Sequence, residues 1–329
     1  MKHQTLIFLA VTNLLLGCFV KNKQSTTMDN NNPLICDPNE GICVVNDSSS
    51  SLNQDAKPKE KNIKVIYFTD PICSSCWGIE AQIRKLKLEY GNAIEIEYCM
   101  GGLLADWSYN SGGISKPSDV AGHWDEVSAY YDMPIDGDIW LQDPLESSYP
   151  PSIAFKAAQL QSQEKAILFL RTIREMVFIE KKNICKWSNL EEAALKVGLN
   201  KEQFKTDYEG KAKLLFEEDL KKTRSFNVRG FPTMYFIDKN NNKELVYGSK
   251  PYQAYESAIL KLDATIKKSQ YNQNWETLFL KYNTYSAKEY SELSGVPRNK
   301  SEDFLNNLVS QGKLEKLTCK NGSIWKLKP

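Results

Sequence analysis

Two cysteines separated by two residues, Cys73 and Cys76, carry the clearest chemistry in the sequence. The apolar run from Val65 to Phe68 lies just before them and predicts a buried strand, and apolar residues at helical spacing follow from Ile79 onward. Cys73 is therefore expected at the start of a helix, where free N–H groups and the helix dipole stabilise a thiolate. Because the two sulfurs can also form a disulfide, this spacing predicts a dithiol redox site.

A Cys-x-x-Cys pair can instead supply half of a zinc site, which needs four ligands. The chain has two histidines, His3 and His123, and no second Cys-x-x-Cys pair. The strand before the cysteines and the helix after them also favour redox chemistry over metal binding. We therefore expect no metal at Cys73 and Cys76, and no cofactor.

The composition sets the scale of the protein. Its 329 residues allow a large folded domain and a smaller one. The 42 Lys and Arg residues nearly balance the 41 Asp and Glu residues, so the overall charge does not direct the chain to nucleic acid. The 8 cysteines are too few for a disulfide-dense miniprotein, so a hydrophobic core must provide most of the stability.

Residues 1–17 resemble an export signal. Their apolar run, Leu6 to Leu16, is too short to span a bilayer as a stable helix. It ends in Leu15-Leu16-Gly17-Cys18, which resembles the cleavage box of bacterial lipoproteins. By that resemblance Cys18 would carry a lipid that anchors the mature chain to a membrane, and the body would lie in the cell envelope, in the periplasm. An ordinary signal peptide or an uncleaved anchor is the alternative.

Residues 18–62 are polar, and we expect a flexible tether because such a composition cannot bury enough apolar surface to fold. The tether contains Cys36 and Cys43, which are separated by turn-forming residues. The pair could be a local disulfide that closes this turn. It could also be a second redox pair that exchanges with the Cys-x-x-Cys site.

Residues 63–269 alternate between strand and helix patterns. A strand, Ile94 to Tyr98, follows the first helix, and strand, helix, strand is the crossover of a parallel sheet. Helical patterns then fill about 114–227. The chain returns to a strand directly after Pro232, where a residue without an N–H is tolerated, and a hairpin and a closing helix follow.

This order, with Cys73-Ser-Ser-Cys76 after a strand and a Gly-Phe-Pro-Thr loop at 230–233, resembles the α/β thioredoxin fold with a large helical insertion, the DsbA type. The segments 70–78, 101–103 and 149–158 resemble the FrnE-like branch of that family, described as predicted protein disulfide isomerases and oxidoreductases. The resemblance implies a cis Phe231–Pro232 peptide that faces the cysteines. Phe231, Pro232 and Thr233 would then bind a substrate strand through exposed backbone groups.

The resemblance also implies a thiol-disulfide oxidoreductase or isomerase. The enzyme would act on cysteine-containing polypeptides and exchange electrons with a redox partner protein. Cys73, nearer the helix start and the surface, would attack, and Cys76 would resolve the mixed disulfide. DsbA itself has a histidine between its cysteines, whereas Ser74 and Ser75 bring no positive charge, so the strongly oxidising potential of DsbA is not assumed. The alternative function is a non-enzymatic adaptor that uses this fold to bind partner peptides.

Other polar residues of the body have plainer interpretations. Asp70 and Glu80 are near enough in sequence to move protons for Cys76, but we expect a helix-start role for Asp70 and a solvated position for Glu80. Three more cysteines have no obvious sequence partner, and we expect inert thiols at Cys99, Cys185 and Cys319.

Residues 270–329 follow a different pattern, with three short helices and a hairpin around Asn321-Gly322. Ser286 and Glu289 predict a capping box at the start of the second helix. The order resembles a winged helix, so we expect a small α+β module. Acidic residues interrupt its basic ones, and a chain with an export signal leaves the compartment that holds DNA. We therefore expect protein contact or structural support, and no nucleic acid.

Overall fold

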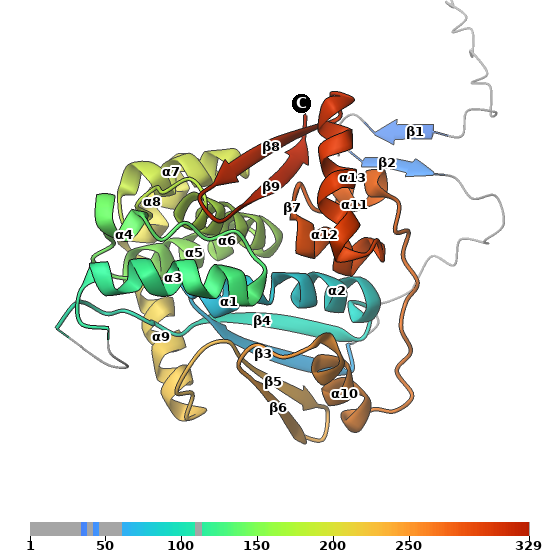
Figure 1. Cartoon of the computed structure of the whole chain (residues 1–329). Coiled ribbons are helices and arrows are strands. Elements are labelled where there is room, and N and C mark those ends of the chain that lie inside the picture. Colours follow the sequence, from blue (N-terminus) through green and yellow to red (C-terminus); the bar gives the residue numbers. More distant parts are fainter. Residues whose placement is uncertain (1–33, 38–41, 46–60, 109–113, 329) are drawn as a thin grey trace, which may run out of the picture. The chain divides into compact units, whose positions relative to one another are not determined.

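The computed structural model describes residues 34–37, 42–45, 61–108 and 114–328 (Figure 1). The chain separates into two compact units, Met1–Lys59 and Glu60–Pro329. The second unit contains both the predicted redox body and the predicted C-terminal module.

The first unit has one described feature, a two-stranded antiparallel hairpin. Its strands are β1 (Leu34–Asp37) and β2 (Ile42–Val45), and their register pairs Cys36 with Cys43. The two cysteines that the sequence placed on either side of a turn are therefore directly opposite one another along the backbone. The predicted signal at 1–17 and the predicted lipidation site Cys18 lie outside the described residues.

The second unit is built on a four-stranded sheet in the order β4-β3-β5-β6. Strands β3 and β4 run parallel, and β5 is antiparallel to both β3 and β6. The apolar run before the cysteines forms the inner strand β3, which explains why that run is apolar on both faces. The strands are β3 (Ile63–Thr69), β4 (Ile94–Met100), β5 (Thr233–Asp238) and β6 (Lys243–Tyr247).

Two consecutive helices follow β3, because the backbone breaks at Ile79. They are α1 (Ser74–Gly78) and α2 (Glu80–Tyr90). The predicted helical insertion is confirmed, and the helices described between β4 and β5 begin at Pro117 and end at Ser225. They are α3 (Pro117–Tyr131), α4 (Ile139–Gln142), α5 (Tyr149–Gln161), α6 (Gln163–Phe178), α7 (Trp187–Lys196), α8 (Lys201–Glu209) and α9 (Lys211–Ser225). The closing helix is α10 (Tyr252–Leu262).

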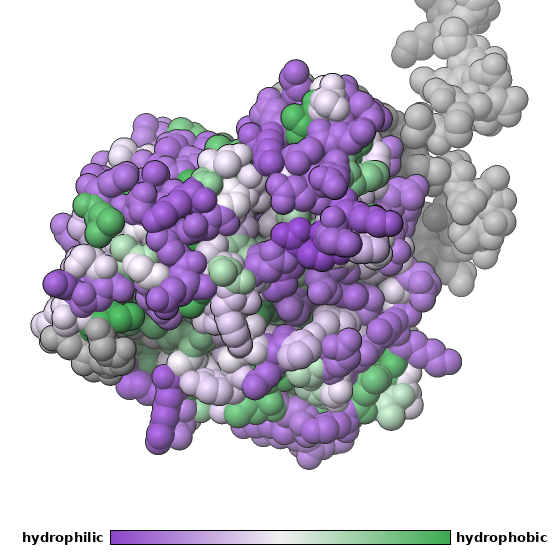
Figure 2. Space-filling view, in the orientation of Figure 1, coloured by the Kyte–Doolittle hydropathy of each residue, from purple (hydrophilic) through white to green (hydrophobic). Residues whose placement is uncertain are grey.

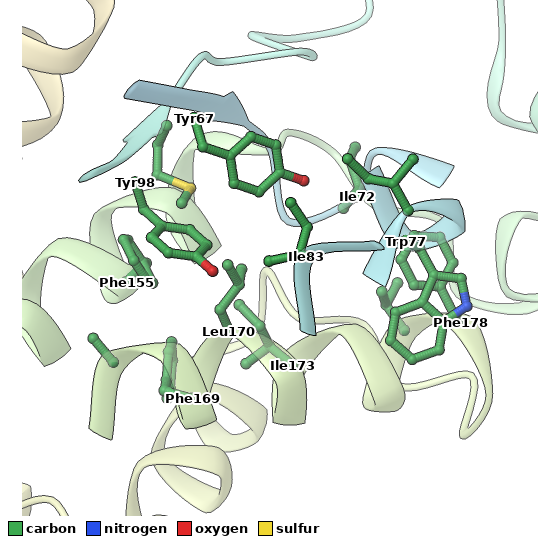
Figure 3. Packing of buried hydrophobic residues seen from close by; sticks show 14 of the residues in the cluster. Tyr67, Ile72, Trp77, Ile83, Tyr98, Phe155, Phe169, Leu170, Ile173 and Phe178 are labelled. Carbon is green, nitrogen blue, oxygen red and sulfur yellow. The ribbon is translucent and has the colours of Figure 1, made fainter. Parts of the chain in front are cut away.

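The main hydrophobic core lies between the sheet, α2 and the helical insertion (Figure 3). Tyr67 and Tyr98 extend from the sheet toward the insertion, where Phe155 meets Tyr98 at a ring distance of 6.1 Å. At the other end of the core, Trp77 stacks on Phe178 with ring centroids 5.5 Å apart. Burial of several large aromatic side chains, each contributing roughly 1.5–3 kcal/mol, ties the insertion to the helix that carries the cysteines.

The C-terminal residues form a small α+β module, as predicted. Its three strands have the order β7-β9-β8, and Ser286 and Glu289 form the predicted capping box. The short strand β7 completes the sheet and was not predicted from the sequence. The elements are α11 (Trp275–Lys281), β7 (Thr284–Ser286), α12 (Ala287–Ser294), α13 (Arg298–Ser310), β8 (Leu314–Cys319) and β9 (Gly322–Leu327).

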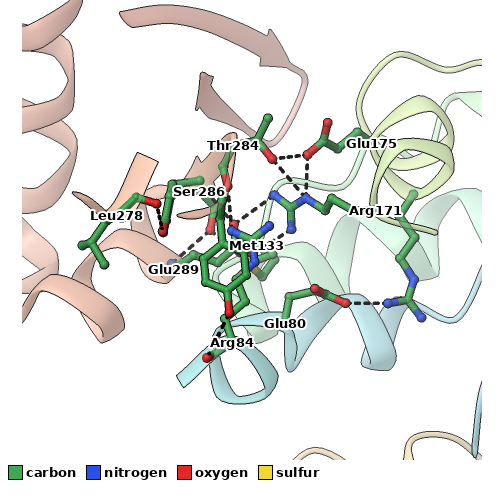
Figure 4. Close-up of polar contacts among 12 residues, drawn as sticks. Glu80, Arg84, Met133, Arg171, Glu175, Leu278, Thr284, Ser286 and Glu289 are labelled. Carbon is green, nitrogen blue, oxygen red and sulfur yellow. Dashed lines mark hydrogen bonds and ion pairs between the residues drawn. The ribbon is translucent and has the colours of Figure 1, made fainter. Parts of the chain in front are cut away.

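A buried ion-pair network joins this module to α6 and α2 (Figure 4). Glu289 of α12 accepts two hydrogen bonds from Arg171 of α6, at 2.7 and 3.1 Å. The guanidinium of Arg84 on α2 lies 3.5 Å from the same carboxylate. Arg171 also pairs with Glu175, and Arg84 donates to the carbonyl of Thr284. The module is therefore held by charged contacts as well as by its own aromatic cluster. None of the helices in the described part of the chain is long and apolar enough to cross a membrane.

Candidate dithiol site

The cysteine pair lies where the sequence predicted, between the end of β3 and the first turn of α1. Cys73 is the N-cap residue of α1, and its Sγ accepts a hydrogen bond from the backbone N–H of Cys76 at 3.1 Å. An N-cap sulfur thus takes the place of the side-chain oxygen that usually satisfies a free N–H at a helix start. Cys73 and Cys76 are both free thiols in the structure.

The proline loop lies at the same end of the sheet. The Phe231–Pro232 peptide is cis, as the family resemblance implied. Thr233, the first residue of β5, is opposite Phe68 of β3 in the sheet register, which brings the loop beside the cysteine turn. A Cβ at Gly101 would overlap the Phe231 ring, so the glycine at the end of β4 leaves the space in which this ring packs.

The two thiols ionise as a pair. Burial opposes a negative charge on Cys76, but the hydrogen bond from Cys73, the charge of Arg174 and the hydroxyl of Thr69 outweigh it and hold the pKa of Cys76 below its ordinary value. Burial and the neighbouring Cys76 raise the pKa of Cys73. The dithiol therefore loses its first proton readily and its second with difficulty. The sequence predicted a lowered pKa for Cys73, and this is wrong in the structure, where the pKa of Cys76 is lowered and that of Cys73 is raised.

The buried Arg174 and its partly buried partner Glu80 lie behind the dithiol, and sequence reasoning missed both roles. Arg174 is fully buried, donates to Thr69 and to the carbonyl of Asp70, and pairs with Glu80 at 2.5 Å. The expected solvated position of Glu80 is therefore wrong. A signal for Arg174 was present, because it shares the apolar helical face of Leu170 and Ile173.

Asp70 holds the loops around the site together. Its carboxylate accepts hydrogen bonds from the N–H groups of Ile72 and Leu103 at 3.0 and 2.8 Å, and from the hydroxyl of Ser148 at 2.8 Å. Burial raises its pKa to about 6, although these hydrogen bonds and Arg174 oppose the rise. The helix-start role expected for Asp70 belongs to Cys73, the N-cap of α1, whereas Asp70 connects the turn before α1 to Leu103 and to Ser148.

The dithiol is covered, which corrects the expectation that Cys73 lies at the surface. Cys73 is 4% exposed and Cys76 is 0% exposed. The hydroxyl of Tyr131 on α3 forms a 2.7 Å hydrogen bond with Ser75 inside the Cys-x-x-Cys turn. Lys288 of α12 donates to the carbonyls of Tyr131 and Gly78, at 2.8 and 3.3 Å. Segments of the insertion and of the C-terminal module thus cover α1.

The other described cysteines of the second unit have no pairing partner. Burial raises the pKa of Cys99, Cys185 and Cys319, so each stays a neutral thiol near neutral pH. Within the described ranges, no group of three His, Cys, Asp or Glu side chains is arranged to hold a metal ion.

Comparisons with known proteins agree with this geometry. A family model described as "Thioredoxin" matches residues 67–257. A curated relative from Halalkalibacterium halodurans, "ClpXP adapter protein SpxH", is 32% identical over 298 residues, which cover 88% of this chain and 96% of the relative. A relative of the same name from Bacillus subtilis is 28% identical and covers 81% and 90%. The chain therefore belongs to the thioredoxin family and to the family of these adapter relatives.

A solved structure supports the fold alone. It is a candidate protein disulfide isomerase from Nitrosomonas europaea, 18% identical, with a TM-score of 0.54. The match covers 61% of this chain and 97% of that protein. The thioredoxin fold with a helical insertion is thereby confirmed. The assignment to the FrnE-like branch stays a prediction, because the relatives from Halalkalibacterium halodurans and Bacillus subtilis carry the adapter name.

Proposed function

We propose that this chain is a protein-binding adapter for the ClpXP protease, the function that the sequence left as its alternative. The single observation that carries the proposal is the relative at 32% identity over 96% of its length, whose name is ClpXP adapter protein. The match extends beyond the thioredoxin domain, so the C-terminal module shares the relationship. The covered dithiol also supports an adapter, because Cys73, a residue that is 4% exposed, cannot meet a protein disulfide without movement of its cover.

The test compares protein half-lives in cells that have or lack this chain. Proteins that the adapter delivers should be stabilised when the chain is deleted and when ClpX is depleted. The double variant Cys73→Ser/Cys76→Ser should restore their turnover as well as the wild type does. If the double variant folds but restores nothing, or if no protein responds to both deletions, the adapter proposal is wrong.

The second candidate function is thiol-disulfide exchange with cysteine-containing polypeptides, and the intact dithiol beside a cis-proline loop favours it. In oxidation, a substrate thiolate attacks Cys73 of the disulfide and Cys76 leaves as a thiolate. The second substrate thiol then displaces Cys73, so the substrate gains a disulfide and the site gains two electrons. A redox partner protein must remove these electrons. Cys76→Ser should trap a mixed disulfide between Cys73 and a substrate. Failure to detect such a mixed disulfide argues against exchange.

The N-terminal features, which rest on sequence resemblance, fit the second candidate function and not the adapter, because an exported chain leaves the compartment in which ClpXP acts. Residues 1–17 would act as a lipoprotein-type signal, Cys18 would carry the lipid, and 18–62 would tether the body to a membrane of the cell envelope. Labelling with a fatty acid analogue tests this, since Cys18→Ala should abolish the label. Cys36 and Cys43 would form a structural disulfide or a redox relay. Their removal should slow re-oxidation of the Cys73–Cys76 dithiol only if they form a relay.

The domain boundaries are part of the same proposal. Residues 63–269 would form the thioredoxin-fold domain, and 270–329 would form a winged-helix-like module that contacts protein and not nucleic acid. Binding of labelled duplex DNA at low salt by the full chain would contradict the second assignment.

A further inference from the structure

The outer strand of the sheet, β6, has an edge that no strand of the described residues pairs. The hydrogen bonds at the two ends of the hairpin fix the pattern of that edge. Asp238 N–H donates to Asn242, and Gly248 N–H donates to Pro232 at 2.8 Å. Backbone N–H and C=O groups alternate in direction along a strand. Since Asn242 and Gly248 direct theirs toward β5, every second residue between these two directs its backbone groups away from β5. The free N–H and C=O groups therefore belong to Lys243, Leu245 and Tyr247.

The side chains of the same three residues lie on the outer face of the sheet. In the register, Lys243, Leu245 and Tyr247 are opposite Ile237, Tyr235 and Thr233 of β5, and paired residues share a face. Leu245 is 52% exposed and Tyr247 is 54% exposed. The inner face is closed instead, since Val246 is buried in the core under α10 and Glu244 pairs with Lys261. Free backbone groups and exposed apolar side chains thus coincide on one side of β6.

Apolar residues continue from β6 toward the dithiol site. The partly buried members of this second apolar face are Phe226, Val228, Phe231, Tyr235 and Ile237. The space-filling view shows hydrophobic side chains at the surface in the lower part of the molecule, where Figure 1 places β5, β6 and α10 (Figure 2). Continuous exposed apolar surface on a folded chain indicates an interaction site.

Basic side chains flank β6 at both ends. Lys243 lies at one end of the strand, with its amine 5.3 Å from the Phe226 ring. Lys250 follows the other end, and Arg229 precedes Gly230, which lies against the hydroxyl of Tyr247 at that end. Among the described residues, none of these three side chains forms an ion pair with a carboxylate. The carboxylates of this face, Glu95 and Glu97, lie on β4 at the opposite edge of the sheet. A segment that binds along β6 therefore meets positive charge at both of its ends.

We propose that β6 binds an extended segment of a partner protein, which joins the four-stranded sheet as a fifth strand. The segment has apolar residues at alternate positions and acidic residues at its ends. Its backbone pairs with Lys243, Leu245 and Tyr247, its apolar side chains cover Leu245 and Tyr247, and its carboxylates meet the three cations. This surface deepens the adapter function proposed above and rests on it for the partner.

The probe is the peptide acetyl-Glu-Thr-Val-Thr-Val-Thr-Glu-amide with a fluorescent label, titrated with the full chain and followed by anisotropy. Lys243→Glu should weaken its binding about tenfold and should improve the binding of the same peptide with Lys in place of Glu. Leu245→Lys should weaken binding of the acidic peptide by at least as large a factor. The matched control is Leu280→Lys on α11, because Leu280 is 78% exposed and far along the chain, and this variant should bind like the wild type.

Backbone pairing has its own test. In an antiparallel arrangement, the valine N–H groups face β6 and the N–H groups of the three threonines face away. N-methylation of the two valines should abolish binding, and N-methylation of the first and third threonines should leave it within about twofold.

Four results would overturn the proposal. They are no saturable binding to the wild type, equal binding by all β6 variants, equal effects of the two methylated peptides, and a concentration-dependent dimer that Leu245→Lys dissociates. The last result would mean that a second copy of the chain occupies the edge. None of these outcomes depends on protein degradation, so a failure here is distinct from a failure of the adapter function.

Discussion

Loss of the charge on Glu289 should loosen the C-terminal module from the thioredoxin domain. The Glu289 side chain is fully buried and accepts hydrogen bonds from Arg171 and from the N–H of Ser286. Glu289→Gln keeps the shape and the cap at Ser286, but it leaves Arg171 and Arg84 with one negative charge fewer. Removing one partner of a buried ion pair costs about 3–5 kcal/mol. Because Arg171 retains Glu175 and Arg84 retains the Thr284 carbonyl, we expect about 3 kcal/mol.

The assay is urea unfolding at pH 7, followed by fluorescence and by limited proteolysis after residue 270. Glu292→Gln is the matched control, because it makes the same change at an exposed position of α12 and should cost less than about 0.5 kcal/mol. Burial opposes the charge of Glu289, yet Arg171 and Arg84 outweigh it and lower its pKa. Its stabilisation is therefore complete above the ordinary value of 4.5 and is lost as the pH falls through the lowered folded value. A loss below about 1 kcal/mol for Glu289→Gln, or an unchanged acid profile, would refute this reasoning.

Three further predictions concern the dithiol site. Tyr131→Ala should uncover Cys73 and raise the rate of its alkylation by iodoacetamide about tenfold. Tyr130→Ala, at a neighbouring residue that is 79% exposed, should leave that rate unchanged. Equal rates in the two variants would show that Tyr131 does not cover Cys73. Asp70→Asn should make stability less dependent on pH. The raised pKa of about 6 makes the wild type gain stability as the pH falls from 7.5 to 4, and the variant lacks this ionisable group. Measured by urea unfolding at both pH values, the wild type should gain about 2.4 kcal/mol relative to the variant, and an equal change in both proteins would contradict the raised pKa of Asp70. Gly101→Ala should displace the Phe231 ring and cost about 1–3 kcal/mol, and an unchanged melting temperature would show that the loop has room.

The sequence predicted the parts of the site that local patterns encode. Two cysteines at fixed spacing, an apolar run before them and a proline at the start of β5 are local signals, and Cys73, Cys76 and Pro232 lie at the expected positions. Ser286 and Glu289 also show that a capping box can be recognised from four residues.

The cover and the buried charges could not be predicted in the same way, because they depend on contacts between distant segments. Arg174 reaches Asp70 across a separation of 104 residues, and Lys288 reaches Gly78 across 210. A charged residue on a helix usually faces solvent, so Glu80 gave no local sign of its burial, and the sign for Arg174 was its place on the apolar face of Leu170 and Ile173. The same limit explains why the predicted surface position of Cys73 was wrong. Tyr131, which contacts Ser75 in the Cys-x-x-Cys turn, lies on α3, far from the cysteines in the sequence.

The most direct test of the account is a reconstituted degradation assay. It would combine ClpXP, the protein whose half-life responds most strongly to this chain, and either the wild type or the Cys73→Ser/Cys76→Ser variant. The account predicts that both forms accelerate degradation equally, with or without a thiol oxidant. Acceleration by the wild type alone, or acceleration that requires turnover of the dithiol, would contradict it and would make thiol-disulfide exchange the function.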